Sequence, residues 1–155
     1  VEAPVSNKNL VVEKCRMDEL VLIVPLNHEL AKQKVVSLSE ITKYPFICRE
    51  EGSGTREVMI ESMKAAGIDN ADLRVSMDFG SLEAIKGAVE AGMGVSVLSS
   101  ATIVKELKLG TLVAIKLDPP LTRPFSFVHQ KQKFRVRAMD ELLSFARNYC
   151  TENPK

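Results

Sequence analysis

The chain has 155 residues, of which 45% are hydrophobic and 26% are charged, and this composition is typical of a globular protein. Its 21 Lys and Arg against 20 Asp and Glu give a formal net charge of +1, which excludes a strong attraction to nucleic-acid backbones or acidic membranes. No apolar run reaches the roughly eighteen residues of a membrane span, so we expect no membrane partner.

The three cysteines, Cys15, Cys48 and Cys150, form no CxxC pair, and their odd number argues against a disulfide framework. This pattern favours a reducing, cytoplasmic location. Val1 stands where an initiating Met is expected, so we interpret the sequence as a fragment of a longer protein. The absence of a leader peptide therefore says little about its location.

The first elements predicted along the chain are strands. Residues 19–25 are almost all apolar, as in a strand buried on both faces of a parallel sheet, and we expect a separate strand at residues 10–14. Ser37 and Ser39 are candidate caps for a short helix whose Leu38 and Ile41 face inward.

Three strand-to-helix units follow, with strands expected at residues 46–49, 73–77 and 95–98. Each strand leads into a helix that ends at a glycine, at Gly67, Gly92 or Gly110. The residues expected on the inner faces of the first two helices recur with helical spacing and are Met59, Met63, Ala66, Leu82, Ile85 and Val89. Because strands and helices alternate, the sequence predicts an α/β fold with mainly parallel sheets.

The last part of the chain contains a predicted crossing. After a short strand at residues 111–115, Pro119 and Pro120 cannot continue a central strand, because proline lacks the backbone donor. A strand at 125–129 and a helix at 136–149 complete the chain, and the residues expected to face inward from this helix are Met139, Leu142, Leu143 and Ala146. We therefore expect two lobes, one made of residues 1–46 and 122–155 and the other of 47–121, and two crossings permit hinge closure on a ligand.

The turn of residues 52–56 is the strongest candidate binding element. It contains Gly52, Ser53, Gly54, Thr55 and Arg56 between a predicted strand end and a helix start, where free N–H groups and the positive dipole end favour an anion. The glycines let a ligand approach the backbone, the hydroxyls donate hydrogen bonds, and Arg56 offers a countercharge. A plain helix cap is the alternative interpretation. The spacing does not match a P-loop, which argues against a nucleoside triphosphate.

Two other turns have a local structural interpretation. Ser81 is a candidate N-cap that would lie at the same sheet edge as the first turn, and taken alone it is more often structural. Gly92 and Gly94 suggest a dinucleotide fingerprint, but they follow a helix and precede a strand, the reverse of the required order. We interpret them as a helix end with a tight turn into a buried strand.

The sequence offers little support for catalysis or metal binding. Cys48 or Ser53 would need a positioned base as a nucleophile, and His28 and His129 lie in other segments with no triad-like context. Histidines and cysteines lack metal-ligand spacing, so no metal or cofactor is predicted. The basic residues at 131–137 are interpreted as a solvated turn rather than a nucleic-acid contact.

Three stretches together resemble the effector-binding domain of LysR-type bacterial transcription regulators, particularly the branch of cysteine-metabolism and carbon-fixation regulators. They are DELVLIVPLNHEL at residues 18–30, ICREEGSGTR at 47–56 and GSLEAIKGAVEAGMGVSVL at 80–98. Each motif is loose alone, but in family order they span most of the chain.

This resemblance implies a type 2 periplasmic-binding-protein-like fold, with two α/β lobes and a small effector in the cleft between them. It implies that the turn at 53–56 contacts the effector and that Met77, Phe79 and Ser81 line the cleft. Glu2 lies in a segment that resembles the end of a first-lobe strand at the cleft rim. We expect the effector to be a small anionic metabolite.

The departure from the family is at the front of the chain. The DNA-binding winged helix-turn-helix, the linker helix and the opening units of the first lobe have no counterpart, so the first lobe is incomplete. DNA, RNA polymerase and the partners of a homodimer or tetramer are therefore expected only for the full-length protein. We also expect this fragment to bind effector weakly or not at all, because the first-lobe contacts are missing.

Two other functions use a similar architecture. A solute-binding protein of a transport system would have a secretion leader in the intact gene, whereas an upstream helix-turn-helix would exclude it. An enzyme on the same fold would lose turnover when Ser53, Thr55 or Arg56 is replaced, but the sequence contains no acid/base constellation that favours it.

Overall fold

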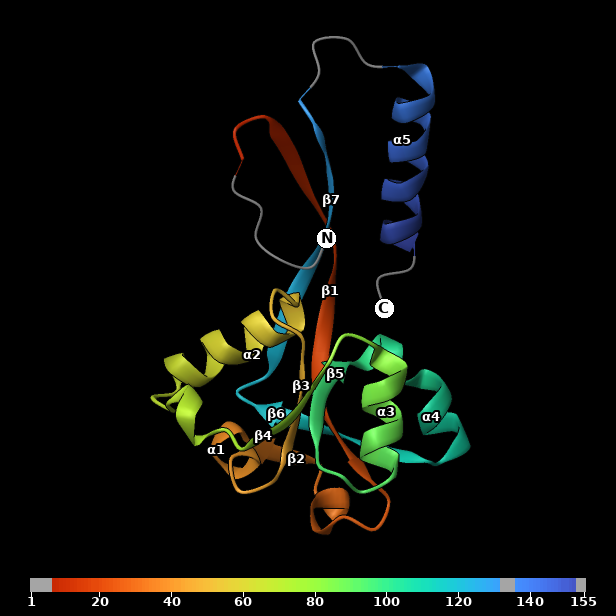
Figure 1. Ribbon diagram of the computed structural model, residues 1–155. Helices are drawn as coiled ribbons and strands as arrows, with labels where there is room; N and C mark the ends of the chain where they lie inside the picture. Colours follow the sequence, from red (N-terminus) through yellow and green to blue (C-terminus); the bar gives the residue numbers. More distant parts are fainter. Residues whose placement is uncertain (1–6, 132–135, 153–155) are drawn as a thin grey trace. The chain divides into compact units, whose positions relative to one another are not determined.

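The computed structural model describes residues 7–131 and 136–152, which form two compact units (Figure 1). Unit 1 comprises Val1–Asp18 and Arg123–Lys155, and unit 2 comprises Glu19–Thr122. Strand β1 (Leu10–Pro25) and strand β7 (Leu121–Gln130) each pass from one unit to the other. The division expected from the sequence assigned residues 19–46 to the other lobe. The structure places residues 19–46 in unit 2, because β1 is one continuous strand and its second half belongs to the sheet of unit 2.

The main sheet of unit 2 is mixed rather than mainly parallel. Its order is β2 (Val35–Ser37), β6 (Leu112–Asp118), β1 and β5 (Ser96–Ser99). β1 runs antiparallel to both β5 and β6, whereas β2 and β6 are parallel. Alternation of strands and helices predicted parallel pairs, but it does not fix the direction of β1, which enters unit 2 without a preceding helix in the described chain.

A second pair of strands positions the candidate site. β3 (Phe46–Arg49) and β4 (Val75–Phe79) are parallel, and Phe46 also forms a parallel bridge to Val95 just before β5. Gly94, at φ +158°, allows the segment before β5 to lie close to the residue that precedes β3. A Cβ at this position would lie 2.5 Å from the carbonyl oxygen of Pro45, which is too close for any other residue. The expected turn from a helix into a buried strand is confirmed.

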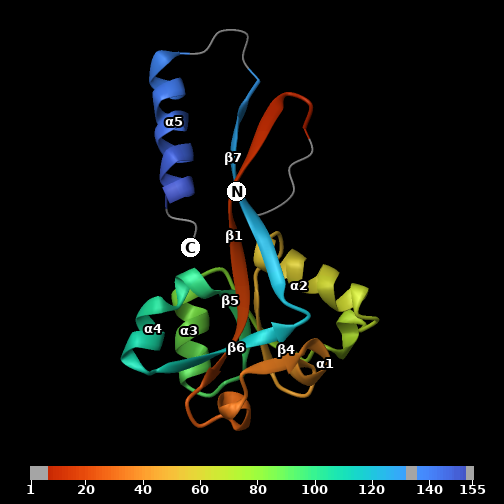
Figure 2. The same ribbon diagram turned by 180° about the vertical axis from the view of Figure 1, so that it is seen from behind.

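The helices of unit 2 cover both faces of its strands (Figures 1 and 2). α1 (Leu38–Ile41) and α2 (Gly54–Ala65) lie on one side, and α3 (Leu82–Glu90) and α4 (Val104–Leu109) on the other. Three short 3-10 helices, at Glu29–Lys32, Asn70–Asp72 and Ser100–Thr102, complete the connections.

The apolar run in β1 explains this two-sided core. Leu20, Leu22 and Val24 pack in the cluster that includes Met59 and Met63 of α2. Their neighbours Val21 and Ile23 pack in the other cluster, which includes Ile85 and Val89 of α3. Alternate residues of a strand point to opposite faces, so a nearly continuous apolar segment is buried on both sides.

Several predicted elements are confirmed and a few are wrong. Ser37 caps α1, with Leu38 and Ile41 buried, as predicted. The strands expected at 10–14 and 19–25 are one strand, and the strand expected at 73–77 begins and ends two residues later. Ala66 is exposed because it is the C-cap residue that follows α2, rather than part of the buried face of this helix.

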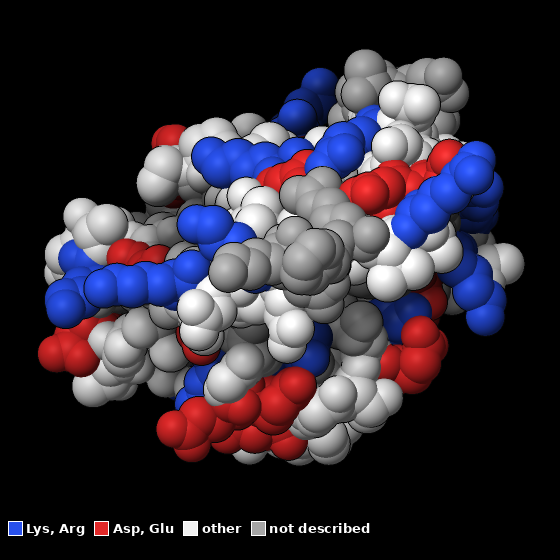
Figure 3. All heavy atoms as spheres, turned by 90° about the horizontal axis from the view of Figure 1, so that it is seen from above, with Lys and Arg blue, Asp and Glu red and all other residues white. Residues whose placement is uncertain are grey.

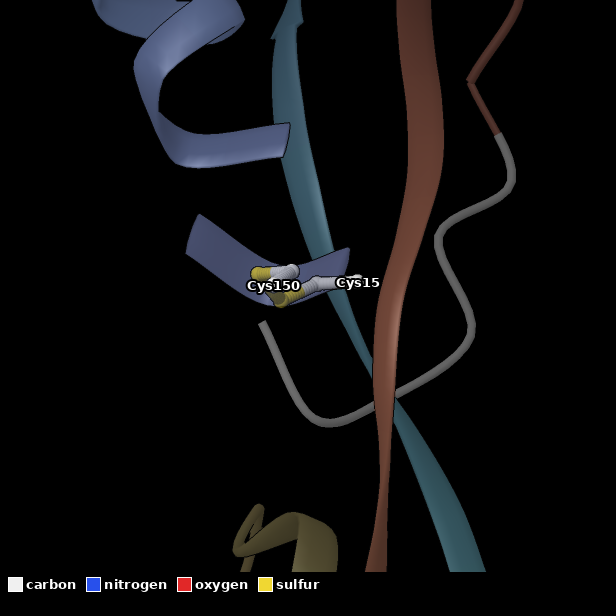
Figure 4. Close-up of a disulfide and its surroundings, with 2 residues drawn as sticks. All are labelled: Cys15 and Cys150. Carbon is white, nitrogen blue, oxygen red and sulfur yellow. A yellow bond between two sulfur atoms is a disulfide. The ribbon is translucent and has the colours of Figure 1, made fainter. Parts of the chain in front are cut away.

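Unit 1 contains the first half of β1, most of β7 and α5 (Arg137–Glu152). Cys15 of β1 forms a disulfide with Cys150 of α5 (Figure 4), so the expectation of no disulfide was wrong. An odd cysteine count leaves one thiol over but does not prevent the other two from pairing, and here the free thiol is the buried Cys48.

The helix α5 buries only part of the face predicted to be inward. Leu143 is buried, whereas Leu142 is 65% exposed and Met139 and Ala146 are partly exposed. Across the described residues, none of the helices combines the length and apolar character needed to span a membrane.

Candidate functional site

The candidate site lies where β3 ends and α2 begins, within unit 2. Gly52 has φ +82°, a left-handed conformation that favours glycine, and the turn is closed by the N–H of Ser53, which donates to the carbonyl of Glu50 at 3.2 Å. The carbonyl of Ser53 then accepts from the N–H of Glu57 at 3.0 Å, which starts α2 with Gly54 as its first residue. The predicted strand, turn and helix are therefore all present.

Ser53 differs from the other serines that precede helices in unit 2. Its side chain is buried, but it makes no hydrogen bond to an N–H group of α2. By contrast, the hydroxyls of Ser37, Ser81 and Ser99 each accept from the backbone of the helix that follows. The first turn of α2 thus has no side-chain cap from Ser53, and its N–H groups and positive dipole end remain suited to an anion.

Thr55 and Arg56 have different surroundings although they are adjacent in the turn. Thr55 is 3% exposed and lines a cavity of about 20 Å³ beneath α2, together with Cys48 and Met59. The side chain of Arg56 is 27% exposed. Only Arg56 of these two reaches solvent, so the hydroxyl of Thr55 is less accessible to a ligand than the sequence predicted.

Arg56 is held by partners from both parallel strands. Its Nη1 donates to Oδ1 of Asp78 at 3.0 Å and to the carbonyl oxygen of Arg49 at 2.9 Å. The register of β3 and β4, which pairs Cys48 with Asp78, brings the Asp78 carboxylate to the turn. Asp78 was not among the residues predicted for the site. The carboxyl ends of two parallel neighbours share a sheet edge, and that rule was the signal available to find it.

A second ion pair lies beside the first. Nε and Nη2 of Arg49 donate to the two carboxylate oxygens of Glu50, each at 2.7 Å. The guanidinium lowers the pKa of Glu50 to about 2, so this carboxylate stays charged at neutral pH. Glu50 therefore neutralises Arg49 at the edge of the candidate site.

The predicted residues of β4 do not all gather around Arg56. Met77 and Phe79 are half-buried and pack against the cluster that contains Ile85, on the face of the sheet covered by α3. Asp78, between them, points to the opposite face, because side chains alternate along a strand. Ser81 caps α3, because its hydroxyl accepts from the N–H of Ala84 at 3.4 Å, and this is the structural role that its position before a helix predicts. Glu2 lies outside the described residues.

The groups considered for catalysis have other surroundings. Cys48 is 5% exposed, and burial raises the pKa of its thiol, which opposes formation of a reactive thiolate. Nδ1 of His28 accepts from the N–H of Leu30, and His129 lies 3.2 Å from a carboxylate oxygen of Glu13. In the described part of the chain, no group of three or more potential metal ligands occurs.

The comparison with protein families decides the identity of the domain. The family model described as "LysR substrate binding domain" matches residues 1–151. The chain belongs to this family. The resemblance seen in the three sequence stretches is therefore confirmed over nearly the whole length.

Its curated relatives include transcription regulators that are about twice as long. The chain is 36% identical over 154 residues to a RuBisCO operon transcriptional regulator of Acidithiobacillus ferrooxidans, covering 97% of the chain and 48% of the relative. It is 34% identical over 134 residues to a probable RuBisCO transcriptional regulator of Phaeodactylum tricornutum, covering 86% and 44%. This LysR domain thus spans less than half of the length of these relatives.

Solved structures confirm the type 2 periplasmic-binding-protein-like fold. The regulatory domain of Synechocystis CcmR, in complex with 2-PG, is 29% identical with a TM-score of 0.86, and the match covers 97% of this chain and 71% of that one. The effector-binding domain of QuiR, in complex with shikimate, is 20% identical with a TM-score of 0.83 and covers 97% and 70%; it supports the fold alone.

Proposed function

We propose that this LysR domain is the effector-sensing part of a DNA-binding transcription regulator and that it binds a small anionic metabolite at the turn of residues 52–56. The observation that supports this most is the start of α2, where Ser53 supplies no cap and Arg56 is the third residue of the helix. Helix N-termini bind anions through free N–H groups and the dipole, and a guanidinium adds a charged donor. The complex of the CcmR regulatory domain with 2-PG agrees with an anionic ligand.

The residues of the turn have the main part in this proposal. Gly52 and Gly54 leave the backbone of the turn open, while Ser53 and Arg56 supply donors. Ligand contact by Thr55, Met77, Phe79, Ser81 and Glu2 stays a prediction from the family resemblance.

The partners follow from the same proposal. Relatives named as transcription regulators support DNA binding by a segment of the full-length protein outside this domain, with RNA polymerase and a homodimer or tetramer as further partners. Cytoplasmic location follows from access to DNA. The domain itself is proposed to catalyse no reaction, and no observation favours a transport protein or an enzyme.

The surface charge of the domain agrees with DNA binding by another segment. Lys and Arg are interspersed with Asp and Glu on the face drawn in Figure 3, and this face does not resemble a basic surface for DNA.

Isothermal titration calorimetry on the full-length protein tests the ligand class, with 2-PG, inorganic phosphate and uncharged glycerol as probes. We expect 2-PG to bind and glycerol not to bind. Arg56→Gln should weaken 2-PG binding by about tenfold or more, because a charge-assisted hydrogen bond contributes about 1.5–3 kcal/mol.

The matched control is Lys116→Gln, which removes the same charge from a side chain that is 70% exposed on β6. It should leave the affinity within about twofold of the wild type, because an exposed charge outside the site is screened by salt. Equal losses in both variants would mean that net charge, not the turn, determines binding.

A further inference from the structure

Three described arginines, Arg49, Arg56 and Arg147, present two different edges of the guanidinium group to their partners. Arg49 and Arg147 each bind one carboxylate through Nε and Nη2, with all four distances at 2.7 Å. Arg56 instead uses Nη1 for both of its hydrogen bonds, to Asp78 and to the carbonyl of Arg49. Its Nε and Nη2 have no acceptor in the described part of the chain.

This unused edge has the geometry that binds an oxyanion. A guanidinium donates two parallel hydrogen bonds to a carboxylate or phosphate, as Arg49 does to Glu50. The side chain of Arg56 is 27% exposed, so solvent and small solutes reach it. It also projects from the first turn of α2, where the dipole favours the same kind of ligand.

Two acceptors fix the orientation of this edge. An Arg side chain has several rotatable bonds, and a guanidinium bound through one nitrogen alone can rotate about it. Here the two protons of Nη1 go to separate acceptors, one on the backbone of β3 and one on the side chain of Asp78 in β4. The side chain of Asp78 is 51% exposed, so its ion pair adds little to the stability of the fold.

We propose that Asp78 is a positioning residue, which holds Arg56 by Nη1 so that the Nε and Nη2 edge receives the oxyanion of the effector. This inference rests on the proposed function and specifies the ligand chemistry as a carboxylate or phosphate group that accepts two hydrogen bonds. Asp78 also places a negative charge next to the bound anion. This repulsion lowers the affinity for the anion, whereas the positioning of Arg56 raises it. Substitutions of Asp78 separate the two effects.

The experiment compares Asp78→Ala with Asp78→Asn in the full-length protein, by calorimetry with 2-PG, inorganic phosphate and acetate. Both variants remove the negative charge, but only Asn keeps an Oδ1 acceptor for Nη1. We expect Asp78→Ala to lower the affinity about tenfold and Asp78→Asn to restore most of that loss. In an Arg56→Gln background, Asp78→Ala should cause no further loss, because the two residues act as one unit. Binding of phosphate without acetate, or the reverse, identifies which oxyanion the edge accepts.

The control for charge alone is Glu61→Ala, on an exposed position of α2. If Asp78→Ala, Asp78→Asn and Glu61→Ala all bind 2-PG as tightly as the wild type or more tightly, Asp78 has no positioning role. If the wild type binds none of the anions, the proposed function fails together with this inference. If Arg56→Gln weakens binding but the Asp78 variants do not, only the role of Asp78 is overturned. Circular dichroism of each variant checks that the fold is intact.

Discussion

The two units of the domain are stabilised by different kinds of interaction. Unit 2 has an apolar core on both faces of its strands, with residues such as Leu22, Ile47 and Ile85 fully buried. Unit 1 buries few apolar side chains of α5 and has the disulfide Cys15–Cys150. Ion pairs occur in both units, for example Arg147–Glu13 in unit 1 and the buried Lys86–Glu106 in unit 2. Burial of apolar surface is insensitive to redox state and weakly sensitive to pH, whereas the disulfide depends on redox state and the ion pairs depend on pH.

Unit 1 also has an apolar groove at its surface. On α5, Leu142, Phe145 and Tyr149 are each more than half exposed, and they border a groove of about 540 Å³ that also includes the disulfide. The buried pair of Asp18 and Arg123, at 2.9 Å, adds a charged interaction in this unit. Unit 1 therefore depends on a small number of specific bonds, and each is open to removal.

Loss of the disulfide should have the largest effect and should affect unit 1 alone. The bond joins residues separated by 135 positions. Restriction of so long a loop stabilises the folded state by up to about 4–5 kcal/mol in the chain-entropy model. Replacing both residues, Cys15→Ser with Cys150→Ser, should therefore greatly increase amide hydrogen exchange in α5 while β5 stays protected.

Reduction of the wild type with dithiothreitol should give the same result as the double variant and should change the double variant no further. Unchanged exchange in α5 under both treatments would show that the disulfide does not stabilise unit 1. The stability of unit 1 would then have to come from its other interactions.

The sequence predicted unit 2 better than unit 1 for a physical reason. Buried strands and capped helices leave local signals, as in the apolar run of β1 and in Ser81 before α3. A disulfide between Cys15 and Cys150 depends on tertiary structure, and no local pattern specifies it. The exposed Leu142 was predicted to be inward because periodicity identifies an apolar face but not what covers it.

For the candidate site too, the sequence predicted local features but not long-range contacts. The turn at 52–56 was found from its residue types, because glycines and hydroxyl residues before a helix have known local roles. The partner of Arg56 was missed, because Asp78 lies 22 residues away and its position depends on the register of β3 and β4. Burial of Thr55 also depends on how α2 packs, which residue types do not determine.

Gly94→Ala should destabilise unit 2 by about 3 kcal/mol, an effect that arises from packing and backbone conformation. The added Cβ would lie 2.5 Å from the carbonyl oxygen of Pro45, at a φ of +158° that other residues rarely adopt. Chemical denaturation measures this loss of stability, and a reductant should not alter it.

The control is Gly87→Ala in α3, where nothing lies within 4 Å of the new Cβ. It should be neutral or stabilise by up to about 1 kcal/mol, and equal effects of the two changes would contradict the close approach at Gly94.

Acid should weaken unit 1 through Glu13, with the smallest of these effects. Hydrogen bonds from Arg147 and His129 lower the pKa of Glu13 from 4.5 to about 2. A carboxylate with a lowered pKa stabilises the folded state above its unfolded pKa, and this contribution is lost as the pH falls from about 4.5 to about 2. The side chain of Glu13 is 26% exposed, so we expect this contribution to the stability of unit 1 to be about 1 kcal/mol after solvent screening.

Hydrogen exchange in α5 at pH 6 and pH 3, corrected for the intrinsic exchange rate, measures this loss of stability. The variant Glu13→Gln should not show the loss. A loss of the same size in the Gln variant would assign the acid sensitivity to other carboxylates, such as Asp18 beside Arg123.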